Sequence, residues 1–286
     1  MSNFFKWQIH KRIINRNLDI QIVPSVKLRC YSDSQSASAV IYCGLYDYDE
    51  MNFLLRYLRD EDLFLDIGAN IGVYTLLAAS KIKKGLIYSF EALPKNFARL
   101  TENLSLNQFK QVKPFSIAIS NSTGNINLNI TDKDCTPFIM PNRTENTVDR
   151  SSPKSIAVPT NTLDSLLQHE SLNNLTLAKM DIEGAEILAL KGATSLLNKQ
   201  LPYVWILEIN DTVNNFGHSK QDVVDLLEQY GYVLYYYDAD TNNLHEIKLE
   251  QQQRKNVLAI SKSALSFVQD RLKNTTEKSD KSINII

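Results

Sequence analysis

Two spacings of apolar residues alternate along most of this chain. Unbroken apolar runs such as LFLDI at 63–67 are typical of strands buried on both faces of a sheet, whereas apolar positions three and four apart, as in 72–82, indicate helices. The pattern predicts strands at 63–67, 85–92, 112–120, 175–182 and 203–209, and helices at 72–82, 94–107, 184–199 and 219–231. This alternation predicts an α/β fold with a Rossmann-like, doubly wound, mostly parallel sheet.

The pattern changes on both sides of this core. Residues 18–32 alternate apolar and polar positions around a Pro-Ser turn, which predicts a β-hairpin, and residues 46–59 have helical spacing. After the last helix, short strands are predicted at 232–239, 243–247 and 256–262, with a hairpin that adds antiparallel strands at one edge of the sheet.

We therefore expect three parts in the chain. Residues 1–60 form an N-terminal hairpin and helix, residues 61–265 form the main domain, and residues 266–286 form a polar tail or linker. Between Thr131 and Ser155 neither spacing is present, and Asn, Asp and Pro are frequent. This stretch is too long for an ordinary connection, and we interpret it as a lid over an acceptor site.

Composition excludes several classes of protein. The formal net charge of -1 gives no electrostatic case for a nucleic-acid partner, and no apolar run is long enough to predict a membrane-spanning helix. The three cysteines are an odd number without C-x-x-C spacing, so they predict neither a disulfide framework nor a zinc site. They fit a reducing compartment, and we expect a cytoplasmic protein. The sequence predicts nothing about oligomeric state.

The turn after the first core strand is the first candidate binding element, because ligands of open parallel sheets bind at the carboxyl ends of the strands. It reads Gly68-Ala69-Asn70-Ile71-Gly72. We expect Gly68 to permit a tight turn and close approach of a ligand, and Gly72 to let the next helix pack on its strand. Asn70 replaces the middle glycine of a dinucleotide-binding loop. It tolerates left-handed backbone angles, but its side chain takes space that a pyrophosphate needs.

Two carboxylates narrow the choice of ligand. Glu91 ends the second core strand, where a carboxylate can accept both hydroxyls of a ribose. Asp66 lies just before the glycine turn, where a cationic group of the ligand would lie. An adenosine with an amino-acid tail and no phosphates meets these conditions, so the sequence predicts S-adenosylmethionine (SAM) as cofactor. We expect Asn121 or a neighbour to lie near the adenine. An NAD-dependent oxidoreductase and a sheet without a cofactor are the alternatives.

Four side chains are candidates for catalysis. Asp181 and Glu183 flank one residue at the end of a buried strand, so both are expected to face the ligand crevice, and Asp181 also to contact the cofactor. Glu208 ends the next strand, and His218 lies in the loop that follows. A hydroxyl acceptor requires a general base, whereas a carboxylate acceptor requires none.

These acids also have other interpretations. Asp181 and Glu183 could instead be satisfied by Lys179 or by backbone amides. Together with Glu208 they could also ligate Mg²⁺ through oxygen, although we predict no metal.

Several blocks of the sequence resemble, in their order, those of the FkbM-family methyltransferases: LFLDIGANIGVYTLLAA, IYSFEALPKNFARLTENLSLN, SIAISNSTGNINL, TNTLDSLL and LAKMDIEGAEILALKGA. The resemblance covers about Tyr46 to Ile260. It departs from the family at Ala92, where FEA stands in place of the frequent FEP.

The resemblance implies a class I SAM-dependent fold and, usually, O-methylation of a small molecule. We expect SN2 transfer of a methyl group to a hydroxyl or carboxylate oxygen of a natural product, a sugar or a modified peptide. A catalytically inactive SAM-binding protein is the remaining alternative.

Overall fold

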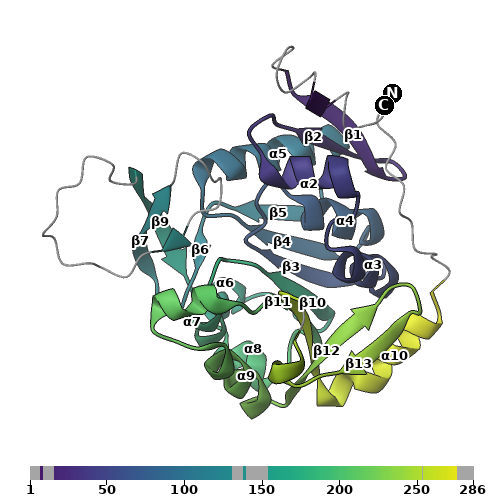
Figure 1. The fold of residues 1–286 in the computed structure, drawn as a ribbon, viewed down its shortest axis with the longest axis vertical. Coiled ribbons are helices and arrows are strands. Elements are labelled where there is room, and N and C mark those ends of the chain that lie inside the picture. The colour runs from purple at the N-terminus through teal and green to yellow at the C-terminus, as the bar shows by residue number, and fades with distance from the viewer. Residues whose placement is uncertain (1–6, 9–15, 131–137, 140–153, 253, 276–286) are drawn as a thin grey trace, which may run out of the picture.

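The computed structural model of the protein describes residues 7–8, 16–130, 138–139, 154–252 and 254–275. Its centre is an eight-stranded sheet with the order β13-β12-β14-β11-β10-β3-β4-β5 (Figure 1). The strands are β3 Leu63–Ile67, β4 Leu86–Phe90, β5 Val112–Phe115, β10 Leu175–Met180, β11 Val204–Glu208, β12 Tyr232–Asp238, β13 Asn243–Glu246 and β14 Asn256–Ser261.

Five adjacent strands, β11, β10, β3, β4 and β5, run parallel. Their order reverses at β3, which pairs with β4 on one side and with β10 on the other. The predicted doubly wound, mostly parallel sheet is therefore confirmed. The predicted edge hairpin is formed by β12 and β13, which pair antiparallel. The last strand, β14, does not extend this edge. It lies between β11 and β12 and is antiparallel to both.

Helices cover both faces of the sheet and form two hydrophobic cores. In β3, Phe64 belongs to one core and Leu65 to the other, because successive side chains of a strand point to opposite faces. The first core lies under α2 Gln35–Cys43, α3 Tyr48–Tyr57, α4 Val73–Lys81, α5 Pro94–Asn107 and α10 Leu265–Lys273. The second lies under α6 Leu163–Leu167, α7 Glu186–Lys191, α8 Thr194–Asn198 and α9 Lys220–Gln229.

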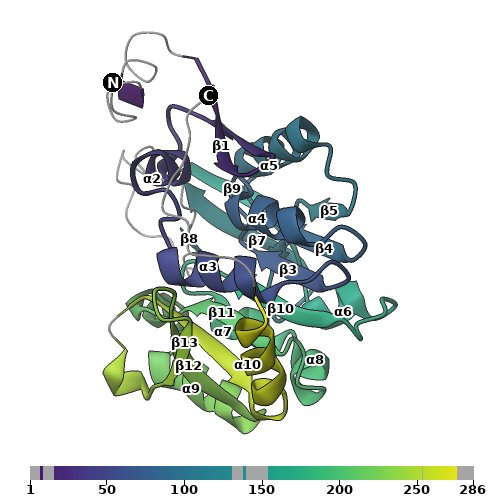
Figure 2. The same ribbon diagram turned by 90° about the vertical axis from the view of Figure 1, so that its right-hand side faces the viewer.

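The N-terminal segment packs on the first of these cores. Its predicted hairpin is confirmed as β1 Leu18–Val23 and β2 Val26–Cys30, and its backbone is held by α5, where Asn103 Oδ1 accepts from the amide of Arg29 at 2.7 Å. The following helix α3 lies against α4 and α10 (Figure 2). None of the helices in the described ranges is long and apolar enough to cross a membrane.

A second sheet of four strands was not predicted. It has the order β6-β9-β7-β8, with β6 Ala118–Ile119, β7 Gly124–Ile130, β8 Phe138–Ile139 and β9 Lys154–Asn161. The predicted third core strand, 112–120, is therefore wrong in extent, because β5 ends at Phe115 and β6 pairs with β9 in the new sheet. The predicted lid spans Thr131 to Ser155. Only its residues 138–139 and 154–155 belong to the described part of the chain, and the rest lies outside it.

Two further predictions need correction. The predicted helix 184–199 is two helices, α7 and α8, separated at Gly192. A Cβ on that glycine would lie 2.1 Å from the carbonyl oxygen of Ser120, so the break is where two backbones meet. The predicted tail begins too early, because α10 extends to Lys273 and buries Val268 and Leu272.

Candidate active site

A cavity lies at the carboxyl ends of the parallel strands, where the loops after β3, β4, β5 and β10 meet. The sheet order places β5 at one end of this region and β10, followed by β11, at the other. The lining residues come from these loops, from the N-terminal segment and from the second sheet. They are Ser36, Tyr46, Asp66, Ile67, Gly68, Ala69, Asn70, Val73, Tyr74, Phe90, Glu91, Ala92, Asn96, Ile117, Ala118, Ile119, Leu128, Lys179, Asp181, Ile182, Glu183 and Ala185.

The loop after β3 is fixed by its backbone. The amides of Gly68 and Ala69 both donate to the carbonyl oxygen of Phe90 at 2.9 Å. Gly68 has a φ of 83°, and a Cβ there would lie 2.0 Å from the carbonyl oxygen of Asp181. The approach of the β10 loop therefore requires a glycine at position 68, a constraint that the sequence did not predict. Gly68 also lines the cavity, so the predicted close approach of a ligand stays a prediction. Asn70 adopts the left-handed conformation, with a φ of 53°.

Gly72 has a different role from the one predicted. It precedes α4 with a φ of 95°, and a Cβ there would lie 2.6 Å from Cδ1 of Leu100 in α5. The glycine thus permits close packing of two helices, rather than packing of one helix on its strand. Gly72 does not line the cavity.

Glu91 joins the loops after β3 and β4. Its Oε2 accepts from the amide of Asn70 at 2.7 Å, and its Oε1 accepts from the amide of Leu93 at 2.8 Å. The residue is only 5% exposed, and burial raises the pKa of its carboxyl to about 7. Each carboxylate oxygen still has a second acceptor position, so the side chain is held in place with capacity for two hydroxyl donors.

Asp66 is the most deeply buried carboxyl of the cavity wall. Its Oδ2 accepts from Oγ1 of Thr75 at 2.5 Å, and burial raises its pKa to about 6. Its Oδ1 has no hydrogen-bond partner among the described residues. A buried acceptor without a partner costs about 1–3 kcal/mol. Because Asp66 lines the cavity, this cost indicates that a donor group of a ligand completes the site.

These two carboxyls fit the predicted cofactor. Glu91 offers acceptors for the hydroxyls of a ribose, and Asp66 offers an unused acceptor for an ammonium group. Beyond Glu91, the side chains of Ile117, Ala118 and Leu128 give the cavity an apolar end that suits an adenine ring. The predicted adenine neighbour Asn121 is itself exposed and does not line the cavity.

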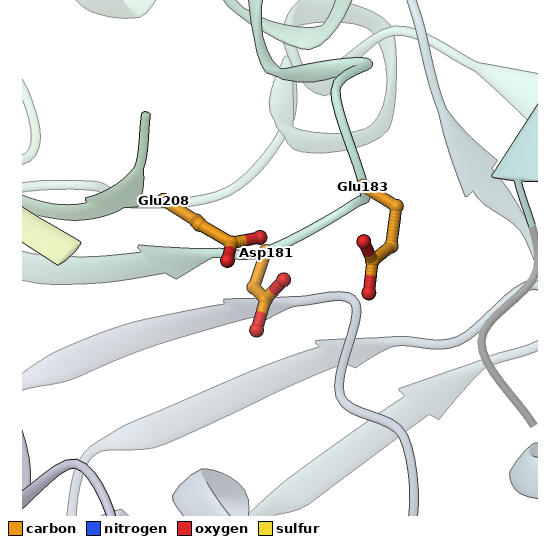
Figure 3. A group of neighbouring side chains, drawn as sticks. All are labelled: Asp181, Glu183 and Glu208. Atoms are coloured by element: carbon orange, nitrogen blue, oxygen red, sulfur yellow. The ribbon is translucent and has the colours of Figure 1, made fainter. Parts of the chain in front are cut away.

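At the opposite end of the cavity three carboxyl groups converge, those of Asp181, Glu183 and Glu208 (Figure 3). An oxygen atom from each lies within 4.8 Å of the others. Asp181 follows β10, Glu208 ends β11, and Glu183 is turned toward them by a left-handed backbone with a φ of 56°. Of the three, Asp181 and Glu183 line the cavity. The spacing suits proton transfer, and it would also suit a divalent cation held through oxygen.

Lys179 sets the charge of this group. It is 3% exposed, its Nζ donates to Oδ2 of Asp181 at 2.8 Å, and the same nitrogen lies 4.9 Å from the ring centroid of Tyr74. The alternative interpretation, in which the carboxylate of Asp181 is paired with Lys179, is therefore confirmed.

The carboxyls of Asp181 and Glu208 share a hydrogen bond and differ in pKa. Burial pushes the pKa of Asp181 upward, but the adjacent Lys179 ammonium outweighs burial and lowers it. The pKa of Glu208 is raised to about 7, first by burial and then by the charge of Asp181. The structure thus keeps Asp181 ionised beside a carboxyl that can hold a proton at neutral pH.

His218 is not brought to the cavity. Its Nε2 lies 3.1 Å from Nζ of Lys191, and its Nδ1 lies 3.7 Å from a carboxylate oxygen of Asp222. Sequence reasoning also missed several lining residues, among them Ser36, Tyr46 and Asn96. No local motif marks these residues, because they reach the cavity only through tertiary packing.

Comparison with known proteins gives a family match over residues 66–234, to the model described as the methyltransferase FkbM domain. The hexuronic acid methyltransferase AglP of Haloferax volcanii is 28% identical over 183 residues, which cover 64% of this chain and 68% of that protein. Methyltransferase 1 of Beauveria bassiana is 23% identical over 193 residues, 61% of this chain and 74% of that protein. Among solved structures, M. jannaschii TYW2 in complex with AdoMet aligns with a TM-score of 0.38 and 14% identity, covering 86% of each chain.

Proposed function

This chain belongs to the FkbM methyltransferase family, whose methyl donor is SAM, and we propose that it methylates a hydroxyl oxygen of a small-molecule acceptor. One observation carries the proposal. A single cavity joins the ribose and ammonium acceptors, Glu91 and Asp66, to the carboxyls of Asp181 and Glu183. Ile117, Ala118 and Leu128 would hold the adenine of the cofactor, Glu91 its ribose and Asp66 its ammonium group. Asp181 and Glu183 would then be left for the acceptor.

The residues act by holding the reactants and moving one proton. When bound, SAM would supply a methyl group on a positively charged sulfur to the acceptor oxygen. Holding both partners at attack distance can supply roughly 7–11 kcal/mol. Asp181 would accept the proton that the acceptor hydroxyl releases as the methyl group passes to its oxygen. Lys179 keeps Asp181 ionised before the step, and Glu208 shares the proton afterwards.

The class of acceptor is inferred from a relative and from the cavity. The name of the Haloferax protein gives a hexuronic acid as its substrate, which supports a sugar as acceptor here. Carboxylates such as Asp181 and Glu183 accept hydrogen bonds from sugar hydroxyls, and a tyrosine such as Tyr46, which lines the same cavity, can pack on a sugar ring. A peptide or natural-product hydroxyl is bound by the same chemistry.

A titration and an acceptor screen test this function. The purified protein is titrated calorimetrically with SAM, S-adenosylhomocysteine (SAH) and NAD, and then incubated with SAM and a panel of sugars, alcohols and carboxylic acids while SAH formation is measured. We expect binding of the first two ligands only, and transfer to a hydroxyl compound. Binding of NAD alone would favour the oxidoreductase alternative. Binding of SAM with every acceptor inert would favour an inactive SAM-binding protein.

The same assay tests the prediction of no metal. Activity is measured after extensive treatment with a chelator and again after addition of Mg²⁺. We expect no change, because Asp181 and Glu208 already share a hydrogen bond and Lys179 already supplies a positive charge. Loss of activity that Mg²⁺ restores would instead assign the three carboxyls to a cation.

A further inference from the structure

The carboxylate of the cofactor still lacks a binding partner among the residues assigned to it. In SAM this group is bonded to the same carbon as the ammonium group, so an ammonium at Asp66 places the carboxylate beside that residue as well. The wall there is acidic, with Asp66, Asp181 and Glu183, and the cation Lys179 already donates to Asp181. The carboxylate therefore requires a neutral donor that faces the cavity next to Asp66.

The backbone of the glycine turn after β3 has little to offer an anion. In many nucleotide-binding proteins the amides of such a turn bind the anionic part of the ligand. Here the amides of four residues of the turn all donate within the protein, those of Gly68, Ala69, Asn70 and Gly72. Because these amides are already used, a side chain of the wall is the more direct source of a donor.

Tyr46 places a hydroxyl in this part of the wall. It lies between α2 and α3 and lines the cavity, and its side chain has no hydrogen-bond partner among the described residues. Asp47, the next residue, accepts from the hydroxyl of Tyr74 at 2.9 Å. Thr75, which follows Tyr74 in α4, donates to Asp66 at 2.5 Å. These bonds to α4 hold the loop that carries Tyr46 on the side of the cavity where Asp66 lies.

A second set of contacts leads to the same place. The ring of Tyr74 lies 4.9 Å from Nζ of Lys179, and Lys179 lies opposite Asp66 in the paired strands β10 and β3. The hydroxyl of Tyr74 is already used in its bond to the loop. Burial raises the pKa of Tyr46 well above its usual range, and the neighbouring carboxylates raise it further. The hydroxyl of Tyr46 therefore keeps its proton and can act as a donor.

Two other polar side chains of the wall lie toward the ribose instead. Ser36 follows Asp33 by three residues, and the carboxylate of Asp33 pairs with Lys95 near the start of α5. Because α5 begins just after Glu91, Ser36 lies toward the β4 end of the cavity. Asn70 is fixed at the same end, since its amide donates to Glu91. Tyr46 is therefore the better placed donor for a group beside Asp66.

We propose that the hydroxyl of Tyr46 donates to the carboxylate of SAM and thereby positions the amino-acid end of the cofactor beside Asp66. Tyr46 precedes the range 66–234 that the family model matches, so this contact is supplied by the N-terminal segment. The inference rests on the proposed function, in which Asp66 binds the ammonium group. The hydroxyl would hold the cofactor, whereas the ring of Tyr46 stays available to pack on an acceptor.

The test compares SAM with decarboxylated SAM, which keeps the adenosine, sulfonium and ammonium groups and lacks the carboxylate. Calorimetry measures the affinity of both for the wild type and for Tyr46→Phe, which removes the hydroxyl and keeps the ring. We expect the variant to bind SAM about tenfold or more weakly, because a donor to a charged acceptor is lost. Its affinity for decarboxylated SAM should stay within about twofold of the wild-type value. A second probe, methylthioadenosine, lacks the whole amino-acid end and should behave in the same way. A thermal melt confirms that the variant is folded.

Tyr42→Phe is the matched control. It removes the hydroxyl of a tyrosine in the same N-terminal segment, one that is 45% exposed and does not line the cavity. We expect it to keep the wild-type affinity for every ligand. Unchanged SAM affinity in Tyr46→Phe, an equal loss for SAM and both probes, or an equal loss in Tyr42→Phe would overturn the inference and leave the proposed function standing. Failure of the wild type to bind SAM would overturn the proposed function, and this inference with it.

Discussion

The two ends of the cavity both present carboxyl groups, but they hold them in different ways. At the β4 end, Glu91 is fixed by two backbone amides. At the β10 end, Asp181 is held by the side chain of Lys179 and by a hydrogen bond shared with Glu208. Backbone amides cannot change their protonation, whereas a carboxyl pair beside a lysine can. The first arrangement suits recognition of a fixed set of hydroxyls, and the second suits a step in which a proton moves.

The largest effect is expected from a substitution at the β10 end of the cavity, where we propose that a proton moves. Asp181→Asn keeps an acceptor for Lys179 but removes the base, so we expect kcat to fall by about 10²–10⁴-fold. The affinity for SAM should change far less, because Glu91 and the loop after β3 are untouched. Single-turnover rates and calorimetry measure the two quantities. Asp222→Asn, an exposed carboxyl at the start of α9, is the control and should have wild-type activity. Equal losses in affinity and rate would contradict the division between the two ends.

The next prediction concerns the contact that joins the two ends. Gly68→Ala would bring a Cβ to 2.0 Å from the carbonyl oxygen of Asp181, at a φ of 83°. Overpacking and left-handed strain together should lower the free energy of unfolding by about 3 kcal/mol or more. Gly217→Ala is a matched control, since Gly217 has a φ of 73° and nothing within 4 Å of the added Cβ. Chemical denaturation should show a loss of about 1 kcal/mol there. Similar losses in both variants would show that the backbone contact does not matter.

These glycines also show what a sequence can and cannot predict. The need for glycine at Gly68 follows from its place after a strand, but its neighbour Asp181 belongs to a distant loop. The break at Gly192 likewise arises from Ser120, which no local pattern reveals. The core strands could be predicted because unbroken apolar runs are a local property. The second sheet could not, because β7 is rich in asparagine and β9 contains Pro159, both unusual in strands.

The residues of the site likewise include some that the sequence could predict and some that it could not. Glu91 and Asp181 could be predicted from their places at strand ends, and the structure brings both to the cavity. His218 follows its strand at a greater distance and bonds to Lys191 instead. Tyr46 reaches the cavity only because α3 packs on α4, a contact between helices that the sequence pattern does not specify.

A smaller effect is expected at the β4 end of the cavity, where two backbone amides fix Glu91. Glu91→Ala removes both acceptors for the ribose and should weaken SAM binding by about 100-fold, because hydrogen bonds to a charged group contribute about 1.5–3 kcal/mol each. Calorimetric titration measures this. Glu91→Gln retains one acceptor oxygen and should lose less. With saturating SAM, kcat of both variants should stay near the wild-type value. Unchanged affinity in Glu91→Ala would contradict the assignment of the ribose.

A last prediction distinguishes the two ends of the cavity by their dependence on pH. Burial raises the pKa of Glu91 from 4.5 to about 7, so in the window between these values the folded protein binds the proton that the unfolded chain has released. The contribution of Glu91 to the stability of the ligand-free protein is therefore fully present below pH 4.5. It is lost as the pH rises through about 7. The loss over this window should be of the order of 3 kcal/mol, since one unit of pKa is worth about 1.4 kcal/mol. In Glu91→Gln, unfolding curves between pH 5 and 8 should show a shallower decline by that amount. An equal slope in the variant would mean that the two amides already offset the burial of the carboxylate, and that Glu91 is ionised before SAM binds.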